Sequence, residues 1–203
     1  MKPCREVRKI LEPAYAPCEH FQGACKSLCW APDIGHVPRG YLGATGTLSE
    51  IRLVLVFAEP GDPHDSERHE SMDTSLAYTY ECMKNGTDLF HRNVRGILDL
   101  CFPEDSFDAQ LRKTWLTESL MCSAPVESGK VASTAWRACT TSYLKPQLSL
   151  MPNAIVAALG SKARDRLKSI GVDFIAAGAA APPGCNFAGV RESWQQIAAA
   201  VQR

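Results

Sequence analysis

The clearest architectural signal in this chain lies at residues 51–61, which read Ile51-Arg52-Leu53-Val54-Leu55-Val56-Phe57-Ala58-Glu59-Pro60-Gly61. The run over residues 51–57 is almost continuously apolar, and a Pro-Gly pair follows it shortly afterwards. Such a run predicts a short strand that is buried on both faces, as the strands of parallel sheets are. Sheets of this kind bind ligands beyond the carboxyl ends of their strands, which is where Glu59 stands.

Three further apolar runs have the same character, at residues 115–121, 154–159 and 172–176. Apolar residues recur at helical spacing in the intervening and following segments, at residues 90–98, 136–144, 163–170 and 190–201. Alternation of strands and helices is typical of α/β proteins. The sequence therefore predicts a three-layer α/β/α fold around a central, mostly parallel four-stranded sheet.

The length of 203 residues suits a single domain, residues 1–203, in which residues 1–48 form an N-terminal extension and a cysteine-bearing flap. The composition, 45% hydrophobic and 22% charged, is that of an ordinary globular protein. The first residues lack the apolar core of a signal peptide, and no run approaches the roughly 18 apolar residues of a membrane span. We therefore expect a cytoplasmic protein without membrane contact, and no feature indicates an oligomer or a protein partner.

The charges balance, with 22 Lys and Arg against 22 Asp and Glu. This balance gives no general attraction to nucleic acid or to an anionic membrane, so any nucleic-acid contact needs a local patch. A chain of this class with nine cysteines is not expected to build a disulfide framework. The cysteines are either buried thiols or, for a subset of them, the ligands of a metal site.

Several segments have the order and spacing of known motifs. Residues 53–61 are similar to a strand that ends in Gly-Glu-Ala-Pro-Gly, and residues 116–125 to the pattern Ile-Thr-Asn-x-x-Lys-Cys-x-Pro-Pro. Residues 88–93 open a helix like a Gly-x-Pro-Phe segment, and residues 151–163 follow the pattern Pro-Lys-x-Ile-Val-x-Leu-Gly-x-x-Ala. Together they resemble the uracil-DNA glycosylase superfamily, most closely its branch with a four-cysteine iron–sulfur cluster. The resemblance runs from about Cys18 to the C-terminus.

The resemblance implies an iron–sulfur cofactor, a [4Fe-4S] cluster held by four thiolates that converge on one centre. The cysteines at the family's ligand positions are Cys25, Cys29, Cys122 and Cys139. The first pair has three residues between its members where the family has two, and Cys18 can replace one of that pair. The cluster would have a structural role, holding the flap against the sheet. An unrelated zinc module is a weaker alternative.

The resemblance also implies a monofunctional DNA glycosylase, which flips a damaged base out of DNA and hydrolyses its N-glycosidic bond. Glu59 would be the catalytic carboxylate that orients water and offsets positive charge on the sugar. Phe90 would stack on the flipped base, with Gly61 and His91 beside it. The alternatives are a solvated loop acid for Glu59 and a helix anchor in the core for Phe90.

Two departures from the family pattern concern recognition of the base. Glu118 replaces the Asn that reads the edge of uracil, and an ionised Glu accepts from N3–H but cannot donate to O4. The family's His, which donates to the leaving base, is missing from residues 179–187. Asn186, backbone N–H groups beside Gly184, or His91 can take its place.

The loop at residues 182–191 stands where the family has its DNA-intercalation loop. Phe187 would wedge into the base stack and Arg191 would contact a phosphate, although Arg191 fits a solvated helix face equally well. The expected partner is DNA that contains uracil or another deaminated base. The alternative is a non-catalytic nucleic-acid-binding protein that keeps the fold and the cluster.

Overall fold

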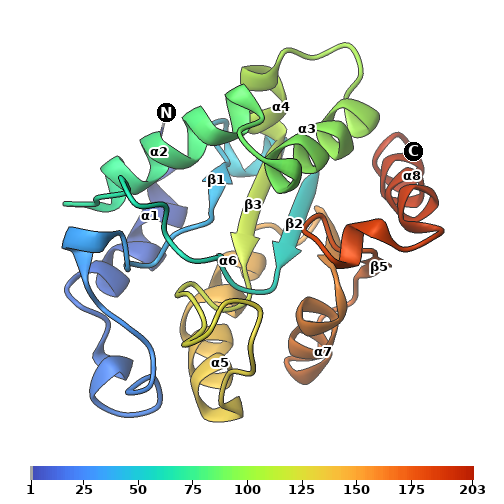
Figure 1. Ribbon diagram of the computed structural model, residues 1–203. Helices are drawn as coiled ribbons and strands as arrows, with labels where there is room; N and C mark the ends of the chain where they lie inside the picture. The colour runs from blue at the N-terminus through green and yellow to red at the C-terminus, as the bar shows by residue number, and fades with distance from the viewer. Residues whose placement is uncertain (1) are drawn as a thin grey trace.

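A five-stranded mixed sheet forms the centre of the computed structural model, which describes residues 2–203 (Figure 1). The strands are β1 (Leu42–Gly43), β2 (Leu53–Phe57), β3 (Thr114–Glu118), β4 (Ile155–Leu159) and β5 (Ile175–Ala177). Their order is β1-β3-β2-β4-β5; β1 is antiparallel to β3, and the other neighbours are parallel. The predicted α/β class and the mostly parallel sheet are therefore confirmed.

The strand count differs from the predicted four because β1 adds a two-residue edge strand. Leu42 pairs with Leu116, and Gly43 pairs with Trp115, a length too short to give a periodic pattern. Apolar residues also continue past the end of β3, where Leu120 and Met121 are buried in a loop instead of a strand. The predicted strand was too long because an apolar run indicates buried residues, whether these form a strand or a loop.

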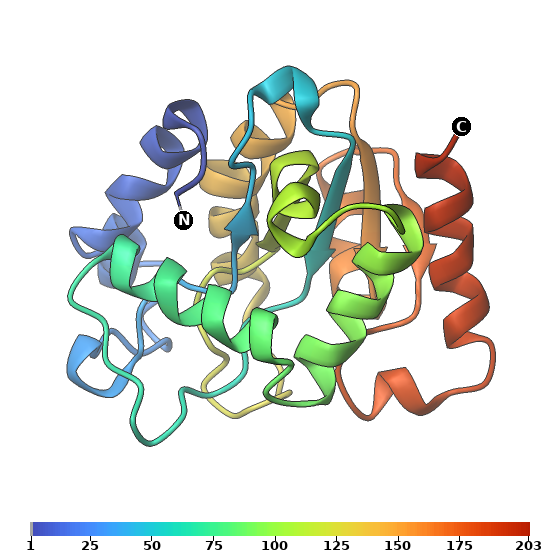
Figure 2. The same ribbon diagram turned by 90° about the horizontal axis from the view of Figure 1, so that it is seen from above.

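Helices cover both faces of the sheet (Figures 1 and 2). One layer contains α2 (Met72–Asn85), α3 (Leu89–Cys101), α4 (Phe107–Lys113) and α8 (Val190–Val201). The other contains α1 (Arg5–Leu11), α5 (Ser133–Cys139), α6 (Lys145–Ser149) and α7 (Ser161–Ser169). The 3-10 turns are Glu12–Tyr15, Glu19–Gln22, Pro32–Ile34, Leu48–Glu50 and Gly184–Asn186, and a π-helical turn, Thr140–Leu144, joins α5 to α6.

Alternation along β2 explains the three layers. Leu53, Leu55 and Phe57 belong to the hydrophobic core beneath α3 and α8, whereas Val54 and Val56 belong to the core on the side of α1 and α7. All five side chains are buried, so the near-continuous apolar run reflects a strand covered on both sides. No helix within residues 2–203 has both the length and the apolar character needed to cross a membrane.

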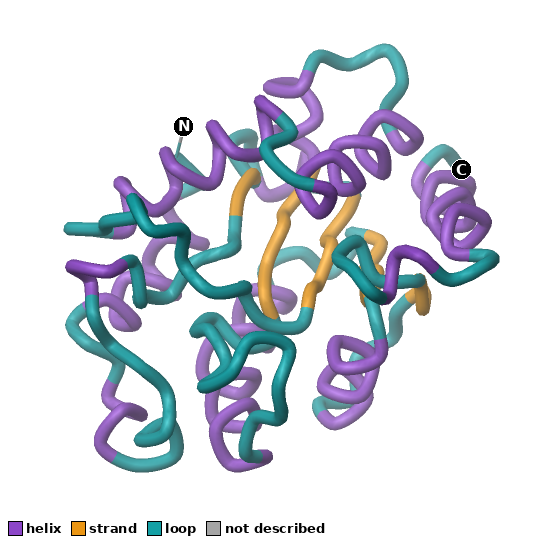
Figure 3. The backbone as a smooth tube through the Cα atoms, viewed as in Figure 1, coloured by secondary structure: helices purple, strands orange, loops and turns teal. Residues whose placement is uncertain are grey.

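The strand order creates a switch point at the carboxyl end of β2. Because β3 and β4 flank β2 on opposite sides, the chain leaves β2 towards one side and leaves β4 towards the other. Such points are where open α/β sheets bind ligands. Figure 3 shows the loops that follow β2 and β3 gathered at this edge, where Ser123 Oγ donates to the Gly61 carbonyl at 2.8 Å.

Candidate functional site

Glu59 lies at the switch point and is paired with two cations from α7. Its Oε2 accepts from Arg166 Nη2 at 2.5 Å, and its Oε1 accepts from Lys162. Lys162 also donates to the carbonyls of Ser128 and Gly129, at 3.2 and 2.8 Å, which ties the loop after β3 to the same point. Only 5% of the Glu59 side chain is exposed, and the two cations hold its carboxyl group in place.

Arg166 connects three segments of the site. Its guanidinium donates to the Ala58 carbonyl just after β2, and to Ser119 Oγ, 3.1 Å away, just after β3. Together with the pair to Glu59, these bonds satisfy a buried charge that would otherwise be costly. Arg166 therefore fixes the geometry of the strand ends rather than offering a free cation.

Glu118 is the last residue of β3 and is almost fully buried, with 3% of the residue exposed. Its Oε2 atom has no hydrogen-bond partner within residues 2–203. Burial raises the pKa of this carboxyl well above its usual value, and the negative charge of Glu59 raises it further, against the opposing effect of Arg166 and Arg39. The neutral, protonated form of Glu118 is therefore favoured.

Gly40 packs directly against this carboxyl. A Cβ atom at Gly40 would lie 2.8 Å from both Cγ and Oε1 of Glu118. The φ angle of Gly40 is +85°, in the left-handed region that favours glycine. No side chain larger than hydrogen fits there without displacing Glu118. The segment at Gly40 thus forms the cover of the carboxyl.

Phe90 and His91 lie in the first turn of α3, which begins where the Asp88 side chain accepts from the His91 backbone N–H at 2.9 Å. The half-buried Phe90 ring meets the Phe57 ring edge to face at 5.1 Å, and Phe57 pairs with Glu118 in the sheet register. Phe90 therefore packs on Phe57 as a core anchor, and Phe57 is the residue that lies beside Glu118 in the sheet. Burial lowers the pKa of His91, which favours the neutral imidazole.

A buried polar network closes the same side of the site. Arg39 Nε lies 3.2 Å from Glu67 Oε1, to which His69 Nε2 lies at 2.7 Å. Arg39 also donates to the carbonyl of Gly61, so Gly61 serves as a backbone acceptor. These contacts hold residues 61–69 against the flap, and no pattern in the sequence indicates this role for Arg39 or Glu67.

The C-terminal loop places its predicted residues at the surface. Asn186 is exposed at the end of the 3-10 turn Gly184–Asn186, and its Oδ1 lies 3.5 Å from Cys185 Sγ. Phe187 is the most exposed aromatic of the loop, at 69%. Arg191 belongs to the first turn of α8 and lines a groove between α8 and α3. Within residues 2–203, no hydrogen bond joins the Asn186 side chain to Glu59 or Glu118.

Four cysteines line one small cavity of about 20 Å³ between the flap, the loop after β3 and α5: Cys18, Cys25, Cys122 and Cys139. Cys29, which the sequence assigned to this set, is exposed and does not line the cavity. Cys18, the alternative to one member of the first pair, therefore shares the cavity with Cys25, Cys122 and Cys139, and Cys29 does not. The 3-10 turn that starts just after Cys18 directs this cysteine inwards, whereas Cys29 follows the buried Leu28 on the surface.

The thiols of this cavity influence one another. The pKa of Cys122 is raised well above its usual value by burial and by Cys139, Cys25 and Cys18, and burial raises the pKa of Cys139 to about 12. The Met121 backbone N–H donates to Cys139 Sγ at 3.4 Å, a bond that stabilises a thiolate or a metal-bound sulfur.

No group of three or more His, Cys, Asp or Glu side chains within residues 2–203 is arranged so that it could hold a metal ion. A cluster differs from a single ion, since its thiolates bind separate iron atoms and lie farther apart. Four soft donors around one cavity, with a backbone N–H directed at one sulfur, fit the donor chemistry of an iron–sulfur cluster.

Lys162 and Arg166 are two further site residues that the sequence patterns did not indicate. They lie four residues apart on α7, the helix that follows β4 directly at the switch point, so both project from one helical face. A basic pair one turn apart, just after a buried strand, was the available signal.

A scan against protein-family models and a search of curated proteins find no match to this chain.

Proposed function

We propose that this protein is a DNA glycosylase that hydrolyses the N-glycosidic bond of uracil or another deaminated base. The observation that carries the proposal is the pair of carboxyl groups at the switch point, Glu59 and Glu118, whose environments differ. Glu59 is an ion held by two cations, whereas burial favours the protonated form of Glu118. In glycoside hydrolases, which also pass through an oxocarbenium-like transition state, two acids with opposite protonation states divide the catalytic roles.

The two acids would divide the work. The ionised Glu59, held without freedom to reorganise, would orient a water molecule and stabilise positive charge that develops on the sugar. The neutral Glu118 would supply the hydrogen-bond donor that an ionised Glu lacks, and its carbonyl oxygen would accept from a ring N–H. This single O–H can donate to one base oxygen only, so Glu118 would replace the family's Asn, and His91 or backbone N–H groups beside Gly184 would serve the leaving base that gains negative charge.

The base would enter between Phe90 and Glu118. The buried Oε2 of Glu118 lacks a hydrogen-bond partner among residues 2–203, and a base edge would satisfy it. Since Gly40 covers the carboxyl, entry would require this segment and the Arg39 network to move aside. The exposed Phe187 would fill the gap that the flipped base leaves in the stack.

The cofactor of the proposed enzyme is a [4Fe-4S] cluster held by Cys18, Cys25, Cys122 and Cys139. Bound there, the cluster would link the flap to the loop after β3 and to α5, so its contribution would be structural. Free cysteines throughout the described chain are consistent with a reducing, cytoplasmic location.

A non-catalytic nucleic-acid-binding protein with the same fold and cluster is the second candidate. One observation favours it: Glu118 is sealed from solvent, with 3% of the residue exposed. In this reading, Glu59 and Arg166 are only a structural pair, and Phe187 still contacts nucleic acid.

The deciding experiment incubates the purified protein with oligonucleotides that carry uracil, hypoxanthine or xanthine, and measures alkali-labile abasic sites. Excision of at least one base is expected. Glu118→Ala should lose most activity, about a hundredfold, while Glu118→Gln, which keeps a donor and an acceptor, should retain more. Glu104→Gln, at an exposed glutamate, serves as the matched control.

Absence of cleavage on all three substrates, together with intact binding of the oligonucleotides, would establish the second candidate. Equal activity of wild type and Glu118→Ala would remove Glu118 from the mechanism even if excision occurs.

A further inference from the structure

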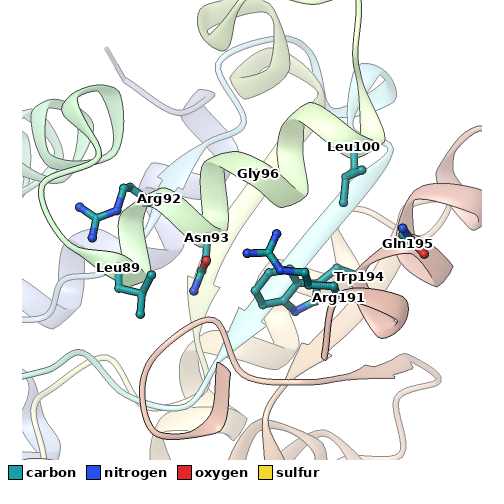
Figure 4. A pocket seen from close by; sticks show the side chains of 8 residues that line it. All are labelled: Leu89, Arg92, Asn93, Gly96, Leu100, Arg191, Trp194 and Gln195. Atoms are coloured by element: carbon teal, nitrogen blue, oxygen red, sulfur yellow. The ribbon is translucent and has the colours of Figure 1, made fainter. Parts of the chain in front are cut away.

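An open groove of about 490 Å³ lies between α3 and α8 (Figure 4). Its lining residues are Leu89, Arg92, Asn93, Gly96, Leu100, Arg191, Trp194 and Gln195. In Figure 4 the α3 residues follow one side of the groove, and Arg191 extends from α8 across the Trp194 ring towards Asn93. The groove therefore combines an apolar floor with charged edges.

The α3 side of the groove has the spacing of a helix-binding surface. Leu89, Asn93, Gly96 and Leu100 follow one another at intervals of four, three and four residues, so they lie on one face of the helix. Leu89 and Leu100 are exposed at 37% and 39%, although both are large apolar side chains. Eleven residues of helix rise by roughly 16 Å, which matches three turns of a partner helix.

Gly96 is the least expected residue of this face. It stands in the interior of α3, where glycine is less favourable than any residue except proline. A Cβ atom there would meet nothing within 4 Å, and the φ angle of Gly96 is not positive, so neither packing nor backbone conformation within residues 2–203 requires glycine. Open space above a helix glycine is what a second backbone needs for close approach.

The charges of the groove select an anionic partner. Arg92 and Arg191 are the ionic residues that line it, and no Asp or Glu does. Neither guanidinium forms an ion pair within residues 2–203. Arg92 is held in place because Nη1 donates to the Gly86 carbonyl at 3.1 Å. Trp194 is nearly fully buried and offers no free ring face, so base stacking by nucleic acid has no platform here.

We propose that the α3–α8 groove is a docking site for an acidic amphipathic helix of a partner protein. Apolar side chains of that helix would pack between Leu89 and Leu100, its backbone would approach α3 at Gly96, and its Asp or Glu residues would pair with Arg92 and Arg191. The proposal is independent of base excision, because no groove residue belongs to the pair of acids at the switch point.

Two phage-displayed libraries of helical peptides provide the test. Both randomise apolar residues at positions i, i+4, i+7 and i+11; one carries Glu at the flanking positions and the other carries Lys. Selection on the wild-type protein should enrich the Glu library at least tenfold over the Lys library. The best peptide is then labelled, and its affinity is measured by fluorescence anisotropy.

The variants distinguish the groove from general stickiness. Gly96→Leu should weaken binding about tenfold or more while the protein keeps its thermal unfolding transition, and Gly96→Ala, the matched control, should weaken it less. Arg92→Glu with Arg191→Glu should turn the preference towards the Lys library. As a control, Arg164→Glu with Lys168→Glu on α7 should leave the preference for the Glu library unchanged.

Three results would overturn the proposal. These are enrichment of neither library, equal enrichment of both, or a selected peptide whose affinity is the same for wild type and Gly96→Leu. A labelled single-stranded oligonucleotide is tested in parallel; if it binds, and only the arginine reversal at the groove weakens it, the groove serves nucleic acid and the protein-partner assignment is wrong.

Discussion

Glu59 and Arg166 form an ion pair across 107 residues of chain, with Oε2 and Nη2 2.5 Å apart and both side chains only 5% exposed. The pair links the end of β2 to the helix after β4, the two elements that border the switch point. Lys162 completes it from the same helix. Both the proposed catalytic role of Glu59 and the contribution of the ion pair to stability depend on this geometry.

Replacing Glu59 should therefore destabilise the fold as well as reduce excision. In Glu59→Gln the buried Arg166 loses its counter-charge, and we expect the free energy of unfolding to fall by about 3 kcal/mol. Urea denaturation followed by circular dichroism measures this change. The surface pair of Glu50 with Arg112 gives the control, since Glu50→Gln should have a far smaller effect. Equal effects of the two substitutions would contradict the buried-pair interpretation.

Glu118 should make the protein less stable as the pH rises. Its pKa is raised in the folded state above the usual 4.5, so above pH 4.5 the folded state binds a proton that the unfolded state has released. Stability should fall with pH from 4.5 up to the raised pKa, by up to about 1.4 kcal/mol per pH unit from this one group. Relative to wild type, Glu118→Gln should gain stability between pH 5 and 8. Parallel stability curves for the two proteins would show that Glu118 is not held neutral.

The cysteine cavity predicts which substitutions remove the cluster. Protein purified without oxygen should contain about four irons per chain and absorb broadly in the visible range. Cys18→Ser and Cys139→Ser should each lose iron and colour, because each removes a cavity thiol. Cys29→Ser should keep both, since Cys29 is exposed. Retention of iron in Cys18→Ser with its loss in Cys29→Ser would restore the assignment made from the sequence, and zinc in place of iron would indicate a different site.

Phe187 should contribute to DNA binding but not to stability. Its side chain is 69% exposed, so Phe187→Ala should change the free energy of unfolding by less than about 0.5 kcal/mol. Loss of a stacking contact should weaken binding to uracil-containing duplex DNA by about fivefold or more. Fluorescence anisotropy measures the affinity, with Val126→Ala, at a comparably exposed apolar residue, as the control. Equal affinities of the two variants would remove the wedge role.

The sequence by itself determined the layered architecture. An apolar run such as residues 51–57 predicts a central strand of a three-layer fold, because apolar side chains on both faces of a strand must be covered by helices on both sides. The amphipathic patterns of α3, α7 and α8 likewise predicted which face of each helix is buried. The end of a buried strand is harder to predict than its presence, because apolar residues such as Leu120 can be buried in the loop that follows it.

Only the tertiary structure decided the state of the site. Glu59 and Arg166 are too far apart in sequence for any local pattern to pair them, and the neutral form of Glu118 depends on Gly40 covering it from the flap. Cys18 joined the cavity in place of Cys29 because the flap's path, which no periodicity encodes, turns one thiol inwards and leaves the other outside. Local patterns select strands and helices, whereas pKa values, ion pairs and ligand sets arise from contacts between segments that meet only when the chain is folded.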